Sequence, residues 1–220
     1  MSPHTPSIPR STDNLDRMAD VDLEFVVAMR EAMSLSTVPS TTAPKAGELA
    51  PVFQLKDING KEIALTDLLL RGAVVINFHR GEWCPYCNFE LRRLASTQPE
   101  MKALGATLVA ISPDFGGAAD SAVNADAHFL KLLDPASEVA QTYGVSFDLA
   151  FSLRDLYTRY GAALPSVRDS GSVRMPLPAT FVVGQNSRIV LSFIDNDYRH
   201  QLQPEAVLDA LRGLKERRRR

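Results

Sequence analysis

The stretch GEWCPYC contains both cysteines of this 220-residue chain, Cys84 and Cys87, with Pro85 between them. Two thiols at this spacing can cycle between a dithiol and a disulfide when one of them is a reactive thiolate. A helix N-terminus stabilises a thiolate, because its free backbone N–H groups and positive dipole end point toward the sulfur. Proline is favoured at the first helical position, so Cys84 is expected to cap a helix. We therefore expect Cys84 to be an exposed, low-pKa nucleophile and Cys87, one turn on, to be the resolving thiol.

Two neighbours of the cysteine pair could tune this chemistry. Arg80 lies four residues before Cys84 and could add a cation, and Trp83 could shield the sulfur and shape the surface that a substrate meets. An unreactive buried cysteine pair and a structural zinc site are the alternatives. A structural zinc site needs four ligands. None of the histidines has finger-like spacing with the cysteines: His4, His79, His128 and His200. Redox chemistry is favoured, with no metal and no cofactor.

The elements around the cysteine pair predict a βαβ unit. The run AVVINFH (73–79) is almost continuously apolar and rich in β-branched residues, which is typical of a strand covered on both faces. ATLVAIS (106–112) has the same character. The helix between them starts at the cysteines, and Pro99 should bend it or end it and start another.

The rest of the pattern extends this unit into an α/β sandwich with a mixed central sheet flanked by helices. We expect a hairpin at 52–65 around Asn59-Gly60, a strand at 127–134, helices at 137–144 and 148–161, strands at 179–184 and 188–195, and a closing helix at 204–216. No internal repeat or second domain is visible.

The ends of the chain differ from this domain in composition. Apolar residues at 14–36 keep helical spacing, and the Pro-containing stretch 37–47 reads as a linker. We therefore divide the chain into an N-terminal extension with one helix and a linker (1–46), a domain (47–216) and a basic tail (217–220). The apolar face of the extension helix favours a homodimer through that helix.

Composition excludes several classes of protein. Hydrophobic residues make up 45% of the chain and charged residues 23%, and the net charge of −2 argues against a nucleic-acid binder. No apolar run is long enough for a membrane span, and the first residues lack the apolar core of a secretory signal. A lone CxxC in such a chain favours a cytoplasmic redox protein.

Several segments resemble one family. NFHRGEWCPYCNFELRRL is similar to the active-site signature of the alkyl-hydroperoxide-reductase and thiol-specific-antioxidant group, the peroxiredoxin-like branch of the thioredoxin fold. GELAPVFQLKDINGKEIALTDLL, LVAISPD, LLDPASEVAQTYGV and LPATFVVGQNSRIVLSFIDNDYRHQLQPEAVLDAL resemble its other segments, so the likeness covers about 47 to 212. It implies a thioredoxin-like fold and a thiol-dependent peroxidase. Cys84 would reduce hydrogen peroxide or organic hydroperoxides, Cys87 would form the disulfide, and thioredoxin or a similar thiol would recycle it.

The sequence departs from standard peroxiredoxins at three positions. They carry a proline, a threonine and an arginine where this chain has Asn77, Gly81 and Pro178. Pro178 resembles the thioredoxin proline, which follows a cis peptide bond and lies against the cysteine pair. Arg80 or Arg174 could replace the missing guanidinium. The alternatives are therefore a general thiol-disulfide oxidoreductase, similar to thioredoxin or glutaredoxin and acting on protein disulfides, and a non-catalytic redox sensor.

Overall fold

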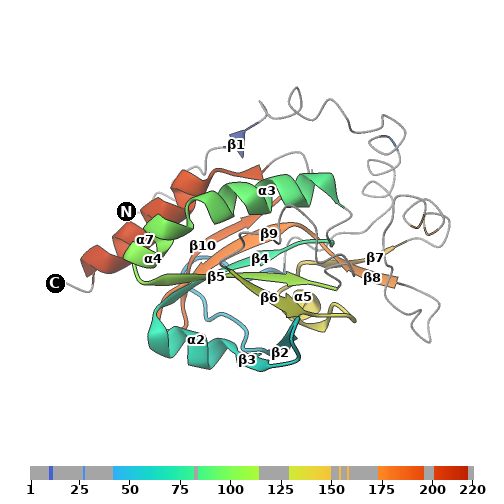
Figure 1. Ribbon diagram of the computed structural model, residues 1–220, viewed down its shortest axis with the longest axis horizontal. Helices are drawn as coiled ribbons and strands as arrows, with labels where there is room; N and C mark the ends of the chain where they lie inside the picture. The colour runs from blue at the N-terminus through green and yellow to red at the C-terminus, as the bar shows by residue number, and fades with distance from the viewer. Residues whose placement is uncertain are drawn as a thin grey trace.

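A mixed β-sheet lies at the centre of the molecule (Figure 1). The structure, a computed structural model, describes residues 10–11, 27, 42–81, 84–113, 129–149, 154, 158, 173–195 and 201–217. Within these ranges the sheet has seven strands, in the order β10 (Ile189–Ile194), β9 (Ala179–Val183), β4 (Ala73–Phe78), β5 (Ala106–Ser112), β6 (Leu130–Leu133), β2 (Gln54–Asp57) and β3 (Glu62–Ala64). Strands β4, β5 and β6 are parallel, and the other neighbouring pairs are antiparallel. The predicted α/β class with a mixed sheet is confirmed.

The βαβ unit forms as predicted. Strand β4 pairs in parallel with β5 from Ala73 opposite Ala106 to Phe78 opposite Ile111. Helices α3 (Pro85–Ser96) and α4 (Gln98–Ala103) connect the two strands. Pro99 lies in the first turn of α4, where its missing N–H would have no helical partner, so it ends one helix and starts the next.

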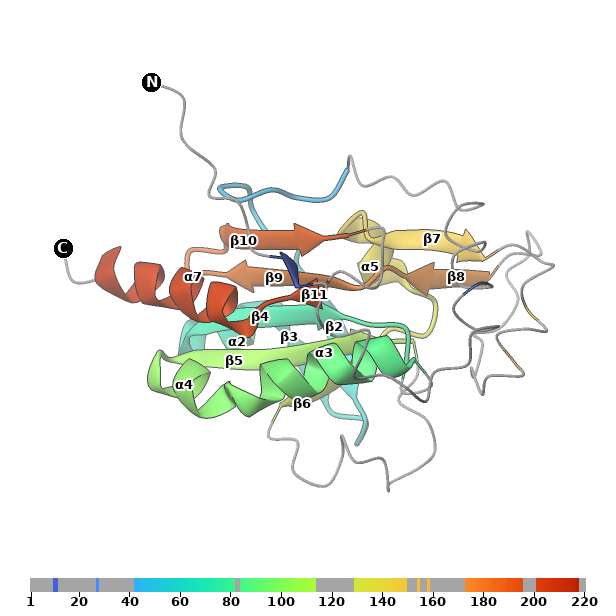
Figure 2. The same cartoon turned by 90° about the horizontal axis from the view of Figure 1, so that it is seen from above.

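Alternating side chains of the sheet build a separate apolar cluster on each face. Helices α3, α4 and α7 (Pro204–Arg217) cover one face, and α2 (Leu65–Arg71) and α5 (Glu138–Thr142) cover the other (Figures 1 and 2). Val75 and Val182 point toward α3 and α4, with Leu91 and Met101. Phe78, Tyr143 and Phe181 pack together on the opposite face, with ring centroids 5.1 to 6.1 Å apart. Such aromatic pairs contribute about 0.5–1.5 kcal/mol each beyond the area that they bury.

A second, two-stranded sheet lies at the end of the central sheet and was not predicted. Strand β7 (Ser146–Leu149) pairs antiparallel with β8 (Val173–Pro176), and β8 leads directly into β9 (Figure 2). The prediction of a helix over 148–161 is therefore wrong at its first two residues. Phe147 and Leu149 are buried and Asp148 is exposed, so the local period is two. Further on, Arg154 and Thr158 are helical, as predicted, and the rest of 150–161 lies outside the described residues.

The N-terminal extension lies mostly outside the described residues. Its residue Val27 is helical and 50% exposed, but the predicted helix at 14–36 and a dimer through it stay predictions. Strand β1 (Arg10–Ser11) pairs antiparallel with β11 (Gln201–Leu202), which the sequence analysis did not anticipate. Across the described part of the chain, no helix has the length and apolar character to cross a membrane.

Candidate active site

The chain turns sharply between β4 and α3 and delivers Cys84 to the helix N-terminus. Gly81 adopts a φ of +132°, and its carbonyl accepts a hydrogen bond from the Cys84 N–H at 3.2 Å. Cys84 itself is extended, with φ −88° and ψ 107°, and its carbonyl accepts the helical bond from Asn88 N–H at 3.0 Å. Pro85 occupies the first turn of α3. The predicted helix cap at Cys84 is therefore confirmed.

The two thiols have different proton affinities. Burial alone would raise the pKa of Cys84, but this effect is outweighed by a hydrogen bond from the Cys87 thiol, the positive charge of Arg80, and the backbone N–H groups of Cys87 and Tyr86. Together these interactions lower the pKa of Cys84 to about 7. The pKa of Cys87 is raised well above its ordinary value, because it is buried and because its proton is held by the Cys84 sulfur. Cys84 is thus the more acidic thiol of the pair, as predicted.

The expectation that Cys84 is exposed is wrong. Its side chain is 0% exposed and that of Cys87 is 2% exposed, and both are free thiols. The reason is that the chain stays buried after β4 ends: His79, Arg80 and Gly81 all lie in the interior before the helix begins. Helix α3 therefore starts inside the molecule rather than at its surface.

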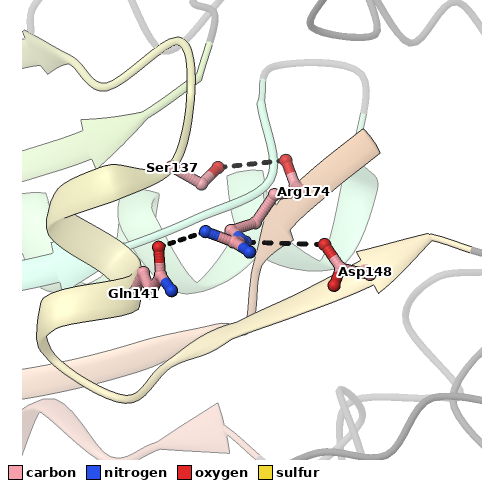
Figure 3. Close-up of polar contacts among 4 residues, drawn as sticks. All are labelled: Ser137, Gln141, Asp148 and Arg174. Atoms are coloured by element: carbon pink, nitrogen blue, oxygen red, sulfur yellow. Dashed lines mark hydrogen bonds and ion pairs between the residues drawn. The ribbon is translucent and has the colours of Figure 1, made fainter. Parts of the chain in front are cut away.

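Of the two arginines considered as replacements for the missing guanidinium, Arg80 acts on the thiols. It is 1% exposed, its charge favours the thiolate of both cysteines, and its guanidinium lies 5.5 Å from the centroid of the Phe147 ring. Arg174 instead connects β8 to its neighbours (Figure 3). Its side chain donates to Gln141 of α5 and lies 3.5 Å from the carboxylate of Asp148 on β7. Its role is therefore structural, whereas a catalytic role for Arg80 remains a prediction.

His79 does not add to the positive charge of the site. It follows β4 directly and is fully buried, and burial lowers its pKa to about 3, so the ring is neutral near pH 7. The other three histidines lie outside the described residues. Within the described ranges, no three His, Cys, Asp or Glu side chains come together in a way that could hold a metal ion.

A buried carboxyl group, Glu90, lies close to the thiols and was missed by the sequence analysis. Glu90 is on α3, 5% exposed, and burial raises its pKa to about 7, with a further contribution from the negative charge of Cys84. Its Oε1 lies 3.3 Å from the hydroxyl of Thr180 on β9, which in turn accepts a hydrogen bond of 3.0 Å from the side-chain amide of Asn77 on β4. Asn77 and Thr180 each interrupt an apolar run in the sequence, which was the available signal.

Pro178 and Trp83 complete the predicted site residues. The prediction of a cis bond before Pro178 is wrong, because the Leu177–Pro178 peptide is trans. The chain is extended here: Leu177 N–H donates to Val145 O at 2.7 Å and continues the β7–β8 ladder into β9. A trans bond is the favoured form by about 0.5–1 kcal/mol. Pro178 is half-buried, and its role in shaping the site stays a prediction. Trp83 lies outside the described residues.

Comparison with known proteins identifies the family. The family model described as "AhpC/TSA family" matches residues 46–192, which is most of the domain that carries the cysteine pair. The chain belongs to the AhpC/TSA family. It is a thiol-based oxidoreductase with a CxxC pair on a thioredoxin-like fold, and the predicted family is confirmed.

Relatives within this family have two kinds of name. The thiol-disulfide oxidoreductase ResA of Bacillus thuringiensis (strain Al Hakam) is 27% identical over 158 residues, 71% of this chain and 74% of the relative. The putative peroxiredoxin bcp of Helicobacter pylori is 39% identical over 70 residues, 32% of this chain and 45% of the relative. The crystal structure of peroxidoxin BcpB from Mycobacterium tuberculosis has a TM-score of 0.55 at 20% identity, covering 78% of this chain and 98% of that one, which shows the shared fold.

Gly81 separates this AhpC/TSA member from the standard peroxiredoxin pattern. Standard members carry a threonine at this position, whose hydroxyl positions the peroxide. At a φ of +132° a β-branched side chain would be strongly strained, so a threonine could not take the place of Gly81 without a change of backbone. The turn before Cys84 is therefore built differently, and the missing hydroxyl is not a simple side-chain loss.

Proposed function

We propose that this protein is a thiol-disulfide oxidoreductase that reduces disulfide bonds of protein substrates. The observation that carries the proposal is the difference in pKa between the two thiols of the cysteine pair. Cys84 has a pKa of about 7 and is substantially ionised near neutral pH, while Cys87 holds its proton. A nucleophile with a pKa near the ambient pH is the most effective attacker of a disulfide.

The reaction would proceed in two steps. The Cys84 thiolate attacks one sulfur of the substrate disulfide, forms a mixed disulfide and releases the other sulfur as a thiolate, which takes up a proton. Cys87 then loses its proton and attacks the Cys84 sulfur, which releases the second substrate thiol and leaves a Cys84–Cys87 disulfide. The substrate gains two electrons, and an external dithiol of the thioredoxin type returns the protein to its reduced form.

Glu90 is the candidate proton acceptor for the second step, because it lies three residues after Cys87 on α3 and its charge interacts with that of Cys84. The pKa of Cys87 is raised, so this thiol needs a base before it can attack. A carboxyl group with a pKa of about 7 is both ionised and basic enough to act near neutral pH. The ResA relative, whose similarity extends over 71% of this chain, carries the name thiol-disulfide oxidoreductase and supports the same proposal.

A thiol peroxidase, the activity first expected from the resemblance, is the second candidate. The observation in its favour is the burial of Cys84, which is 0% exposed, because a peroxide is far smaller than a protein disulfide. In that reaction the Cys84 thiolate would attack the O–O bond and become a sulfenic acid, releasing water or an alcohol. Cys87 would then condense with it, forming the disulfide and a second water.

One variant distinguishes the two activities. Cys87→Ser keeps the nucleophile but cannot resolve a mixed disulfide, so it should capture an oxidised model protein such as insulin as a stable adduct. Its reaction with hydrogen peroxide should be no faster than that of an ordinary exposed thiolate. Cys84→Ser is the matched control and should form neither product. Fast formation of a dimedone-reactive sulfenic acid, without mixed disulfides, would overturn the proposal in favour of the peroxidase.

A further inference from the structure

Asn77 and Thr180 form a buried polar pair on the sheet face beneath α3. They lie directly opposite each other on the antiparallel strands β4 and β9. Asn77 is 1% exposed and Thr180 is 0% exposed. Both belong to the face on which Val75 and Val182 contact the apolar side chains of α3, so the pair introduces polar groups into a mainly apolar interface.

The hydrogen bonds of this pair have a definite direction. The Asn77 side-chain N–H donates to the Thr180 hydroxyl oxygen at 3.0 Å. With that lone pair engaged, the hydroxyl's own hydrogen is available to Glu90 Oε1, 3.3 Å away. A hydroxyl that donates to a carboxylate favours the ionised form of that carboxylate. Asn77 on β4 therefore donates to Thr180 on β9, and Thr180 donates to Glu90 on α3, the helix that carries the thiols.

We infer that Asn77 and Thr180 are positioning residues that keep Glu90 able to accept a proton beside Cys84. This inference rests on the proposed function, in which Glu90 is the base. It also gives a role to Asn77, one of the positions at which the chain departs from the standard peroxiredoxin pattern. A proline there would have no side-chain amide to begin the series of donations.

The pair acts against the other influences on Glu90. Burial and the negative charge of Cys84 favour the protonated carboxylic acid, which cannot serve as a base. Arg93 on the same helix and the backbone N–H of Leu202 on β11 favour the carboxylate, together with Thr180. His79 directly follows β4, two residues after Asn77. Its ring is neutral near pH 7, so it adds no charge that would act on Glu90. Removing the Thr180 hydroxyl should therefore shift Glu90 toward its protonated form.

The size of the effect follows from the strength of a hydrogen bond to a charged group. The loss of one such bond typically moves the titration midpoint of the charged group by about one pH unit or more. We therefore expect Thr180→Val, which keeps the shape and removes the hydroxyl, to raise the Glu90 titration midpoint by about one pH unit. Near pH 7 the carboxylate fraction, and with it the rate of the second step, should then fall about fivefold.

The direct test is the titration of Glu90 by heteronuclear NMR, with its carboxyl signal assigned by its loss in Glu90→Gln. The measurement is made in a Cys84→Ser background, so that the thiol does not titrate in the same range. Thr180→Val should raise the midpoint, and Thr180→Ser should restore it to within about 0.3 pH unit, because serine keeps the hydroxyl. Asn77→Leu should raise it by a smaller amount.

The matched control is Thr107→Val, the same change on β5. The side chain of Thr107 lies on the opposite face of β5 from that of Ala110, which packs beneath α3. Thr107→Val should therefore leave the Glu90 midpoint unchanged. An unmoved midpoint in Thr180→Val, or an equal shift in Thr180→Ser, would overturn the inference. If Thr180→Val does not fold, an unchanged midpoint in Asn77→Leu has the same consequence.

The titration is independent of the proposed function, so the two can fail separately. If the protein reduces no disulfides, the proposed function fails whatever the midpoint of Glu90. If it does reduce them, the pH–rate profile of Thr180→Val in the otherwise native chain should move upward with the Glu90 midpoint. A shifted midpoint with an unmoved profile would overturn the catalytic importance of the pair.

Discussion

Replacing Glu90 with glutamine should stabilise the protein at pH 8 but not at pH 5. The pKa of this buried carboxyl is raised from 4.5 to about 7 in the folded chain. A carboxyl with a higher pKa in the folded than in the unfolded state binds its proton more tightly when folded, so folding stability falls as the pH rises between the two values. This loss of folding stability is absent below pH 4.5 and complete above about pH 7.

The magnitude follows from the difference between the two pKa values. At about 1.4 kcal/mol per pH unit, the rise from 4.5 to about 7 corresponds to about 3–4 kcal/mol. Glutamine has nearly the same shape and carries no charge at any pH. Between pH 5 and pH 8 the stability of Glu90→Gln relative to wild type should therefore rise by about 2–3 kcal/mol, because pH 5 already lies slightly above the lower of the two pKa values.

The assay is urea denaturation at both pH values, followed by circular dichroism with reductant present. His79 also titrates differently in the folded and unfolded chain, but it does so in both proteins and cancels in the comparison. Cys84 does not cancel fully, because it interacts with Glu90. The same comparison in a Cys84→Ser background removes that contribution, and most of the pH-dependent difference should persist there.

A difference between Glu90→Gln and wild type that is the same at pH 5 and pH 8 would refute this reasoning. It would mean that the pKa of Glu90 in the folded protein is close to its unfolded value, so that the carboxyl group is already ionised at pH 5. The carboxyl group would then not exchange a proton near neutral pH, and its role as a base would be refuted as well.

Three further predictions concern the thiols and the turn before them. Cys84 should react with iodoacetamide much faster than Cys87, with a midpoint near pH 7, and equal rates on peptide mapping would contradict the assignment. Arg80→Met should raise the Cys84 pKa by about one unit, read from thiolate absorbance in the ultraviolet, whereas Arg174→Met should leave it unchanged. Gly81→Ala should lower the free energy of unfolding by about 1–3 kcal/mol, because alanine is strained at a φ of +132°.

Gly213 provides the control for the change at Gly81. It lies inside α7, and a Cβ atom there would meet nothing closer than the Arg217 guanidinium at 3.8 Å. Gly213→Ala should therefore stabilise the protein by about 0.5–1 kcal/mol in the same urea assay. Opposite signs at the two glycines would identify the backbone conformation at Gly81 as the cause.

Local sequence patterns were sufficient for the elements that carry the cysteine pair. The apolar runs at 73–79 and 106–112 correspond to β4 and β5, and Pro85 correctly indicated that Cys84 caps α3. Each of these features is decided by residues a few positions apart, because strand periodicity and capping are local properties.

The remaining features depend on residues that are distant in the sequence. Asn77 and Thr180 are 103 positions apart, and Thr180 and Glu90 are 90 apart, so no short motif could join them. The burial of Cys84 results from the tertiary packing of the segment that follows β4, in which His79, Arg80 and Gly81 are also buried. The trans bond before Pro178 shows that the resemblance of this residue to the thioredoxin proline does not fix the backbone, which here continues an extended strand instead.

The distribution of the site over α3, β4 and β9 limits what a transplanted loop could achieve. The segment from Gly81 to Cys87 brings both thiols and the turn that orients them. Moved into another scaffold, it would leave behind Glu90 and the two strands that hold its carboxylate. An engineer who exchanged only this loop would obtain a reactive cysteine, but the proton acceptor would have to come from the recipient's own helix and sheet.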